Sequence, residues 1–194
     1  DRTDVHASPR CSCKMGSDVV IAPVLVIEPM AARHIDVIRA IDARCYSSPW
    51  GVATWRTELA EKTRHHVVAR RGDEILGHAG ILVILDEVHV TTVAIHPDHQ
   101  SGGLATQLVL HLLDHARSIG GASATLEVRA SARRTQRLYA RFGFQPAGAR
   151  KSYYSAPVDD AIVMWLHDLQ TPGVGQRLDL IRHEIGAAAE GELL

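Results

Sequence analysis

Three consecutive stretches rich in β-branched residues constrain the fold of this chain more than any other feature of its sequence. They are His66–Arg70, Glu74–Leu85 and Val88–Ile95, and the turn residues Arg71-Gly72-Asp73 separate the first two. Short apolar runs bounded by such turn residues are typical of adjacent antiparallel strands. The sequence therefore predicts an antiparallel β-meander near the middle of the chain.

Helical periodicity follows the meander after a short loop that contains glycine. Leu104, Leu108, Leu112 and Ala116 recur at helical spacing, and Gly120-Gly121 supplies a C-terminal stop signal. The same kind of pattern predicts further helices near 35–41, 55–59 and 133–141, and strands near 19–27, 124–129, 145–150 and 161–166. The order of these elements indicates a mixed α/β fold.

Length and charge narrow the class of protein. A chain of 194 residues with a net charge of -1 has room for one folded domain and no excess of basic residues for nucleic acid. Its three cysteines suggest no disulfide framework, and no apolar run is long enough for a membrane span or a signal peptide. We therefore expect a cytoplasmic protein without nucleic-acid or membrane partners. Its expected parts are a disordered leader at 1–18, a folded domain at 19–168, and a linker with a short, weakly docked C-terminal helix or tail at 169–194.

The loop between the fourth expected strand and the long helix is a candidate binding site. It reads Gln100-Ser101-Gly102-Gly103-Leu104-Ala105 and precedes a helix N-terminus, where free backbone N–H groups can bind phosphate. Its glycine spacing excludes a Rossmann fingerprint, and the lack of a following Lys-Ser or Lys-Thr excludes a nucleoside-triphosphate loop. Taken alone, the loop is explained better as a plain strand-to-helix connection.

Several motifs in a fixed order resemble one family. Gln-x-x-Gly-x-Ala, following His-Pro-x-His, resembles the acyl-CoA loop of the GNAT acetyltransferase superfamily. Leu126–Ser131, Leu138–Phe144, and Arg150–Tyr154 with Asp160-Ala161 are similar to the bacterial ribosomal-protein alanine N-acetyltransferases of the RimI type. The resemblance extends over about Val24 to Leu166, which is nearly all of the expected folded domain.

This resemblance implies a fold, a reaction and partners. The implied fold is the GNAT acyl-CoA N-acyltransferase fold, a mixed, mostly antiparallel sheet flanked by helices on both faces. The implied reaction is direct attack of the N-terminal α-amino group of a protein on acetyl-CoA, which is the co-substrate. The leading candidate acceptor is the N-terminal alanine of a small-subunit ribosomal protein. We expect a monomer or weak dimer that uses no metal.

The resemblance also assigns the coenzyme to main-chain groups. Backbone amides at the end of the fourth strand would bind the pantetheine arm, and one could stabilise the oxyanion that develops during transfer. These amides belong to Val93, Ala94 and Ile95. The diphosphate would lie on the loop and the first helical turn, at Gln100, Ser101, Gly102, Gly103, Leu104, Ala105 and Thr106.

Two residues carry the implied proton transfers. An α-amino group, with a reference pKa of roughly 7.7 to 8.0, must lose a proton before it attacks a thioester. Strand alternation puts Glu127 on the opposite face from Leu126 and Val128, and the resemblance makes its carboxylate the proton acceptor, directly or through water. The same resemblance makes the Tyr139 hydroxyl the proton donor to the leaving thiolate. From position alone, Glu127 could instead be a strand residue paired with Arg129 or another base, and Tyr139 a core residue.

A group of aromatic residues is expected to border the acceptor groove. Flat rings can hold an extended peptide N-terminus with little loss of side-chain freedom, although each ring alone could equally be a core residue. The candidates are Tyr46, Trp50, Tyr153 and Tyr154. His96 and His99 lie in a turn, and the adjacent His65-His66 pair adds no complete ligand set, so no metal site is predicted.

Two positions depart from the RimI pattern. Ala132 stands where an Asn is usual and Gly102 where a basic residue is frequent, so coenzyme binding could weaken unless Arg133 and Arg134 supply phosphate contacts. These departures keep open a non-catalytic module that senses acyl-CoA. A further alternative keeps the chemistry but takes a polyamine, an antibiotic or another small amine as acceptor. An acidic acceptor pocket would favour that alternative.

Overall fold

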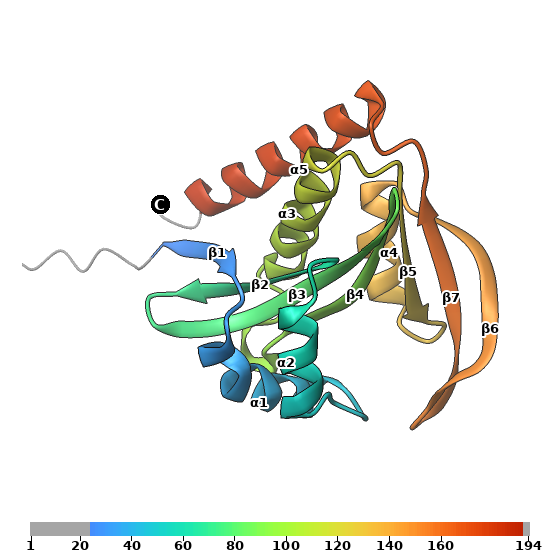
Figure 1. The fold of residues 1–194 in the computed structure, drawn as a ribbon. Coiled ribbons are helices and arrows are strands. Elements are labelled where there is room, and N and C mark those ends of the chain that lie inside the picture. Colours follow the sequence, from blue (N-terminus) through green and yellow to red (C-terminus); the bar gives the residue numbers. More distant parts are fainter. Residues whose placement is uncertain (1–23, 192–194) are drawn as a thin grey trace, which may run out of the picture.

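The fold is organised around one seven-stranded sheet (Figure 1). The computed structural model describes residues 24–191; the expected leader at 1–18 and residues 19–23 of the first expected strand lie outside the described residues. The strands are β1 Leu25–Pro29, β2 Arg64–Arg71, β3 Glu74–Ile84, β4 Glu87–Ile95, β5 Ser123–Arg129, β6 Gln145–Ser155 and β7 Val158–Leu166. The helices are α1 Ile35–Cys45, α2 Val52–Ala60, α3 Leu104–Ser118, α4 Arg133–Phe142 and α5 Pro172–Gly191, with 3-10 turns at Ala32–His34 and Pro97–His99.

The strand order confirms the expected sheet. It is β1-β2-β3-β4-β5-β7-β6, and all neighbouring pairs are antiparallel except β4 with β5. Strands β2, β3 and β4 form the expected meander, while β7 lies between β5 and β6. Helices α1 and α2 cover one face of the sheet, and α3, α4 and α5 lie on the other (Figure 1).

The parallel neighbours β4 and β5 separate soon after they meet. Among the residues that the structure describes, they pair only at Glu87 with Ser123, Val88 with Ala124, and His89 with Thr125. Strand β4 also carries a β-bulge, because Gly80 pairs with Thr92 whereas Ile81 pairs with Val90. The remainder of β4 and β5 therefore diverges and leaves an opening in the middle of the sheet.

Two hydrophobic cores hold the helices against the sheet. The main core lies between the sheet and α3, α4 and α5, and its fully buried members include Leu108, Leu112 and Phe142. The second core lies under α1 and α2, where Ile38 and Trp55 pack against Val68 of β2. Because the two cores occupy opposite faces, the opening between β4 and β5 is framed on both sides by packed helices.

A buried polar network connects α1 and α2 to β3. The Asp42 carboxylate accepts a hydrogen bond from Trp55 Nε1 at 3.1 Å and contacts His78 Nε2 at 2.8 Å. The Trp55 ring also lies edge-on to His66 and His78, each at 5.3 Å between ring centroids. A Cβ at Gly80 would lie 2.1 Å from His66 Nδ1, so glycine is needed there to admit the ring. This network fixes the C-terminal half of α1 on the sheet.

The C-terminal segment differs from the expectation of a short, weakly docked helix or tail. Helix α5 spans 20 residues, and Val174, Leu178 and Ile181 are buried in the main core. Arg182 of α5 adds an ion pair with Asp114 of α3 at 2.8 Å. Helix α5 is therefore an integral layer of the fold that crosses α3 and α4 (Figure 1).

No helix within residues 24–191 is both long enough and apolar enough to cross a bilayer.

Candidate active site

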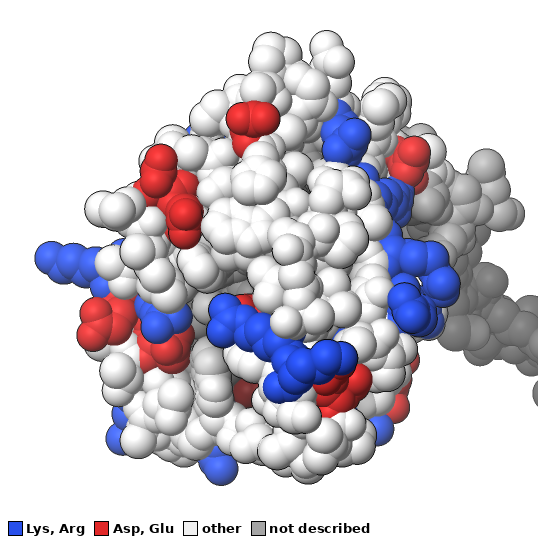
Figure 2. Space-filling model, turned by 90° about the vertical axis from the view of Figure 1, so that its right-hand side faces the viewer, with Lys and Arg blue, Asp and Glu red and all other residues white. Residues whose placement is uncertain are grey.

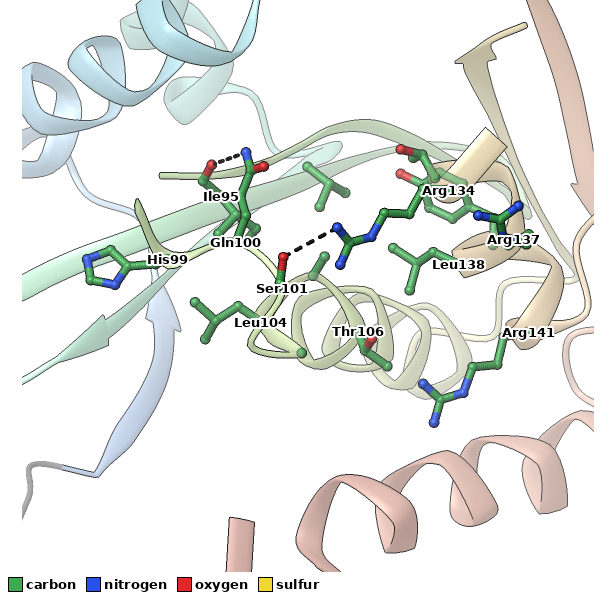
Figure 3. Close-up of a pocket in the computed structure, with 15 residues that line it drawn as sticks. Ile95, His99, Gln100, Ser101, Leu104, Thr106, Arg134, Arg137, Leu138 and Arg141 are labelled. Carbon is green, nitrogen blue, oxygen red and sulfur yellow. Dashed lines mark hydrogen bonds between the residues drawn. The ribbon is translucent and has the colours of Figure 1, made fainter. Parts of the chain in front are cut away.

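A pocket of about 650 Å³ lies between the end of β4, the N-terminal turn of α3 and the length of α4 (Figure 3). It brings together most of the residues expected to hold the coenzyme. Its lining consists of Val93, Ile95, His99, Gln100, Ser101, Gly103, Leu104, Ala105, Thr106, Arg134, Thr135, Arg137, Leu138, Tyr139 and Arg141. The expected residues Ala94 and Gly102 are not part of this lining.

The loop before α3 presents backbone N–H groups to this pocket. Ser101 and Gly103 both have positive φ angles, 77° and 75°, and such alternating backbone favours a concave ring of amides. The first turn of α3, beginning at Leu104, adds amides that have no partner within the helix and the positive end of the helix dipole. A Cβ on Gly103 would meet no atom within 4 Å. The loop therefore has the shape and polarity to bind a phosphate group.

The edge of β4 that faces the opening belongs to Val93 and Ile95. The Val93 carbonyl accepts a hydrogen bond from the Tyr46 hydroxyl at 3.0 Å, and the Ile95 carbonyl accepts one from Gln100 Nε2 at 3.2 Å (Figure 3). Successive residues of a strand direct their N–H and C=O groups to opposite neighbours. The Val93 and Ile95 amides thus face the opening, whereas Ala94 faces β3, where it pairs with His78. Two of the three expected amides are available to a ligand.

Tyr139 reaches the pocket from α4. Its side chain is 6% exposed and packs edge-on against Phe144, with 5.8 Å between ring centroids. Burial first, and then the nearby phenols of Tyr46 and Tyr154, raise the pKa of Tyr139 well above its ordinary value. The hydroxyl therefore stays protonated at neutral pH and can donate a hydrogen bond into the pocket.

Glu127 lies on the other face of the sheet. Leu126 and Val128 point into the main core, so alternation along β5 directs Glu127 toward the side of α1 and α2. Its side chain is 26% exposed and pairs with Arg150 Nη2 of β6 at 3.1 Å. Arg129, the partner considered from the sequence, instead lies over the Tyr154 ring, with its Cζ 4.1 Å from the centroid.

Tyr154 connects the two expected catalytic residues. Its hydroxyl donates to the Glu127 carbonyl oxygen at 3.4 Å, and its phenol is close enough to Tyr139 to contribute to the raised pKa of that residue. Tyr139 of α4 and Glu127 of β5 thus lie on opposite faces of the sheet, and Tyr154 lies near both residues.

The expected acceptor residues divide into two groups. Tyr46 contacts Thr92 Oγ1 at 3.0 Å beside the opening, and Tyr153 lies edge-on to Tyr154 with 5.1 Å between centroids. Trp50 instead packs on Trp55 at 4.9 Å, partly buried against the second core. The structure therefore places the three tyrosines near the opening and gives Trp50 a packing role.

Charges on the acceptor side are largely paired. Figure 2 shows the side of the molecule that carries β6 and β7, where acidic side chains lie beside basic ones and much of the surface is uncharged. Lys151 pairs with Asp160 at 2.7 Å, as Arg150 does with Glu127. These pairs neutralise the carboxylates there, which argues against the acidic pocket that a polyamine would favour.

Three arginines of α4 line the pocket. The sequence suggested one of them, Arg134, as a possible phosphate contact and gave no role to the other two. Arg134 lines the pocket, and its Nη1 donates to Ser101 Oγ at 3.3 Å (Figure 3), whereas Arg133 does not line it. Arg137 and Arg141 also line the pocket. Their spacing of three and four residues places them on one helical face, a signal that the sequence contains. Sequence reasoning missed it because it considered only the start of the helix.

The histidines make other contacts than a metal site would need. Among residues 24–191, no three His, Cys, Asp or Glu side chains group as metal ligands. His65 stacks on His115 of α3, with 3.8 Å between ring centroids. Burial first, and then His115 and His111, lower the pKa of His65 to about 4. These rings are therefore neutral packing groups at neutral pH.

The chain is similar in sequence and in fold to known N-acetyltransferases. Residues 35–144 match the model of the Acetyltransferase (GNAT) family. The [ribosomal protein bS18]-alanine N-acetyltransferase of Escherichia coli K12 is 34% identical over 128 residues, which are 65% of this chain and 86% of that protein. The N-alpha-acetyltransferase RimI of Mycobacterium tuberculosis is 37% identical over 120 residues, 60% of this chain and 74% of that protein. The crystal structure of the E. coli ribosomal-protein-S18-alanine N-acetyltransferase superposes with a TM-score of 0.70 at 28% identity, covering 75% of this chain and 94% of that one.

Proposed function

The chain belongs to the GNAT family of acetyltransferases, and from this premise we propose that it acetylates the N-terminal α-amino group of a protein. The proposed acceptor is the N-terminal alanine of ribosomal protein bS18, which is the substrate named for similar enzymes. The proposed acetyl donor is acetyl-CoA, and the proposed location is the cytoplasm, where ribosomal proteins are made. The observation that carries the proposal is the opening between β4 and β5, which Tyr139 and Glu127 approach from opposite faces.

The residues that line the pocket fit the coenzyme. The amides from Gln100 to Thr106 and the N-terminal end of α3 suit a diphosphate, and Val93 and Ile95 offer main-chain groups to a pantetheine arm. Leu104 and Leu138 supply apolar walls between these polar places. When bound, acetyl-CoA supplies the acetyl group as a reactive thioester.

In this proposal Glu127 removes a proton from the acceptor. An α-ammonium group cannot attack a thioester, so its proton must pass to a base at the opening. The Glu127 side chain is partly exposed on the proposed acceptor face, where it contacts Arg150. The ionised carboxylate accepts the proton directly or through one water molecule.

Tyr139 supplies a proton on the coenzyme face. Its buried hydroxyl lines the pocket, and the raised pKa keeps it protonated throughout the neutral range. Donation of this proton to the departing sulfur avoids release of a thiolate into a buried site. Since donor and acceptor lie on opposite faces, the two proton transfers do not compete for one group.

The acceptor face suits a peptide better than a small polycation. Tyr46, Tyr153 and Tyr154 offer aromatic walls, and Tyr153 is 51% exposed and free to cover a bound chain. The carboxylates of Glu127 and Asp160 are already paired with Arg150 and Lys151. An extended peptide beginning with a small residue can enter such a groove with its amine next to Glu127.

A peptide panel tests this proposal. The protein is incubated with acetyl-CoA and peptides that carry the bS18 N-terminal sequence with Ala, Ser, Met or Glu as first residue, and products are read by mass spectrometry. We expect acetate on the α-amine of the Ala peptide and none on a matched peptide with a blocked N-terminus. Acetylation of spermidine but of no peptide would refute the proposal that the acceptor is a protein N-terminus. Coenzyme binding without turnover of any amine would refute the proposal that the protein is an enzyme.

A further inference from the structure

The wall of the pocket that α4 contributes is basic. Arg134, Arg137 and Arg141 line it from one face of the helix. Among the described residues that line the pocket there is no Asp or Glu. Three guanidinium groups and the positive end of α3, equivalent to roughly half a charge, together exceed the two negative charges of a diphosphate. The pocket therefore holds more positive charge than one diphosphate requires.

The two ends of this arginine row lie at different places. Arg134 donates to Ser101 Oγ at 3.3 Å, beside the phosphate-binding loop. Arg141 comes two helical turns later, roughly 10 Å further along the axis of α4. In Figure 3 its guanidinium lies between Thr106 and helix α5, away from Ser101. Arg134 and Arg141 are therefore placed to contact different anionic groups.

Helix α5 holds Arg141 in this place. The Arg141 guanidinium pairs with Glu184 of α5, and the two side chains are 41% and 63% exposed. One carboxylate occupies only part of a guanidinium's five N–H donors, so others remain free toward the pocket. An exposed pair of this kind contributes at most about 1 kcal/mol to stability. The pair with Glu184 can orient the Arg141 guanidinium and still leave it able to bind an anion of higher charge.

We propose that Arg137 and Arg141 bind a phosphomonoester that is separate from the diphosphate, the 3′-phosphate on the ribose of coenzyme A. This inference rests on the proposed function, because it assigns residues to the coenzyme of that function. A phosphomonoester carries roughly -1.5 to -2 charges at neutral pH, and guanidinium groups bind it through paired N–H donors. The arginine row thereby makes the chain selective for CoA over 3′-dephospho-CoA.

Calorimetric binding of CoA and of 3′-dephospho-CoA tests the proposal without relying on activity. Wild-type protein should bind CoA about tenfold or more tightly than 3′-dephospho-CoA, the factor expected for a hydrogen bond between charged groups. Arg141→Gln and Arg137→Gln should lose most of this preference while binding 3′-dephospho-CoA as the wild type does. Arg133→Gln is the matched control, because it removes the same charge from α4 outside the pocket, and it should keep the full preference.

Three results would count against the inference, and they are distinguishable. Equal affinity of the wild-type protein for both ligands refutes the phosphate site but leaves the proposed function intact. An equal loss of affinity for both ligands in Arg141→Gln or Arg137→Gln assigns these residues to the shared part of the ligand and also refutes it. Failure of the wild-type protein to bind either ligand refutes the proposed function itself. All three arginines are exposed, so thermal unfolding of each variant should stay close to that of the wild type.

Discussion

Replacing Tyr139 with Phe is the sharpest test of the site, because it removes one hydroxyl and little else. The Tyr139 ring packs on Phe144 and lies in the main core, and Phe retains these contacts. Within the part of the chain that the structure describes, the hydroxyl makes no hydrogen bond that the substitution would break. Unfolding stability should therefore change by less than about 1 kcal/mol.

The expected loss of turnover follows from the role of the hydroxyl. A positioned general acid contributes about 10² to 10⁴ in rate, which corresponds to about 2.7 to 5.4 kcal/mol of transition-state free energy at 1.36 kcal/mol per tenfold. The loss should appear in kcat, whereas the dissociation constant for acetyl-CoA should stay within about twofold. Burial raises the pKa of Tyr139, so wild-type activity should show no decline from its ionisation below about pH 10.

The assay combines initial rates on an Ala-initiated peptide with calorimetry and thermal unfolding of both proteins. A Tyr139→Phe protein that is folded, binds acetyl-CoA normally and turns over more than about a hundredfold more slowly supports the role. A variant with wild-type kcat would refute it. If affinity for acetyl-CoA and turnover fell by the same factor, Tyr139 would be a binding residue, and the proton donor would have to be sought elsewhere.

Three further changes have expected outcomes. Leu178→Ala should lower the free energy of unfolding by about 2–5 kcal/mol because Leu178 is 1% exposed, whereas its control Leu180→Ala, at a 66% exposed position, should change it little; urea denaturation would show whether α5 is part of the cooperative fold. Stability should fall as the pH drops from 6.5 toward 4, because the unfolded chain binds a proton at His65 that the folded chain, with its lowered pKa of about 4, does not; His65→Gln should flatten this dependence, and an unchanged slope would contradict it. In Gly103→Ala, the added Cβ would contact no other atom, but alanine is strained at the φ angle of 75°. The substitution should therefore cost about 1 kcal/mol of stability and weaken acetyl-CoA binding in calorimetry. Unchanged affinity would argue against the loop as a phosphate site.

The local elements were predictable because each depends on residues that are close in sequence. The meander follows from β-branched runs separated by Arg71-Gly72-Asp73, and α3 follows from the spacing of Leu104, Leu108 and Leu112. The loop from Gln100 to Ala105 was predictable as a strand-to-helix connection for the same reason, since its glycines and the helix start are contiguous. Such features require no knowledge of which strands become neighbours.

The features that could not be predicted from the sequence depend on the order of strands and on packing between distant elements. Glu127 and Arg150 meet because β7 lies between β5 and β6, and no local pattern specifies that order. Helical spacing in the C-terminal segment predicted a helix, but its length and its burial against α3 and α4 depend on the completed fold. The divergence of β4 from β5, on which the site rests, is likewise a property of the sheet rather than of either strand.

Neither of the two positions that depart from the RimI pattern, Ala132 and Gly102, is part of the pocket lining. Ala132 packs against the main core at the N-terminus of α4, and Gly102 lies outside the pocket lining. The polar side chains that line the pocket include the guanidinium groups of Arg134, Arg137 and Arg141, and Arg134 donates to Ser101 Oγ. Of the two arginines considered as substitutes for the missing side chains, Arg134 lines the pocket and Arg133 does not.

The surroundings of Cys45 favour direct transfer to the amine over an acetylated enzyme. Its thiol lies at the end of β4, with Sγ 3.3 Å from the Ile95 carbonyl oxygen. The thiol donates a hydrogen bond to this carbonyl oxygen. Burial first, and then the Asp42 carboxylate, raise the pKa of the thiol. A thiol must ionise to be an effective nucleophile, and these contacts oppose ionisation. Under the proposed function, donor and acceptor enter from opposite faces at one opening, and the amine attacks the thioester without a covalent relay.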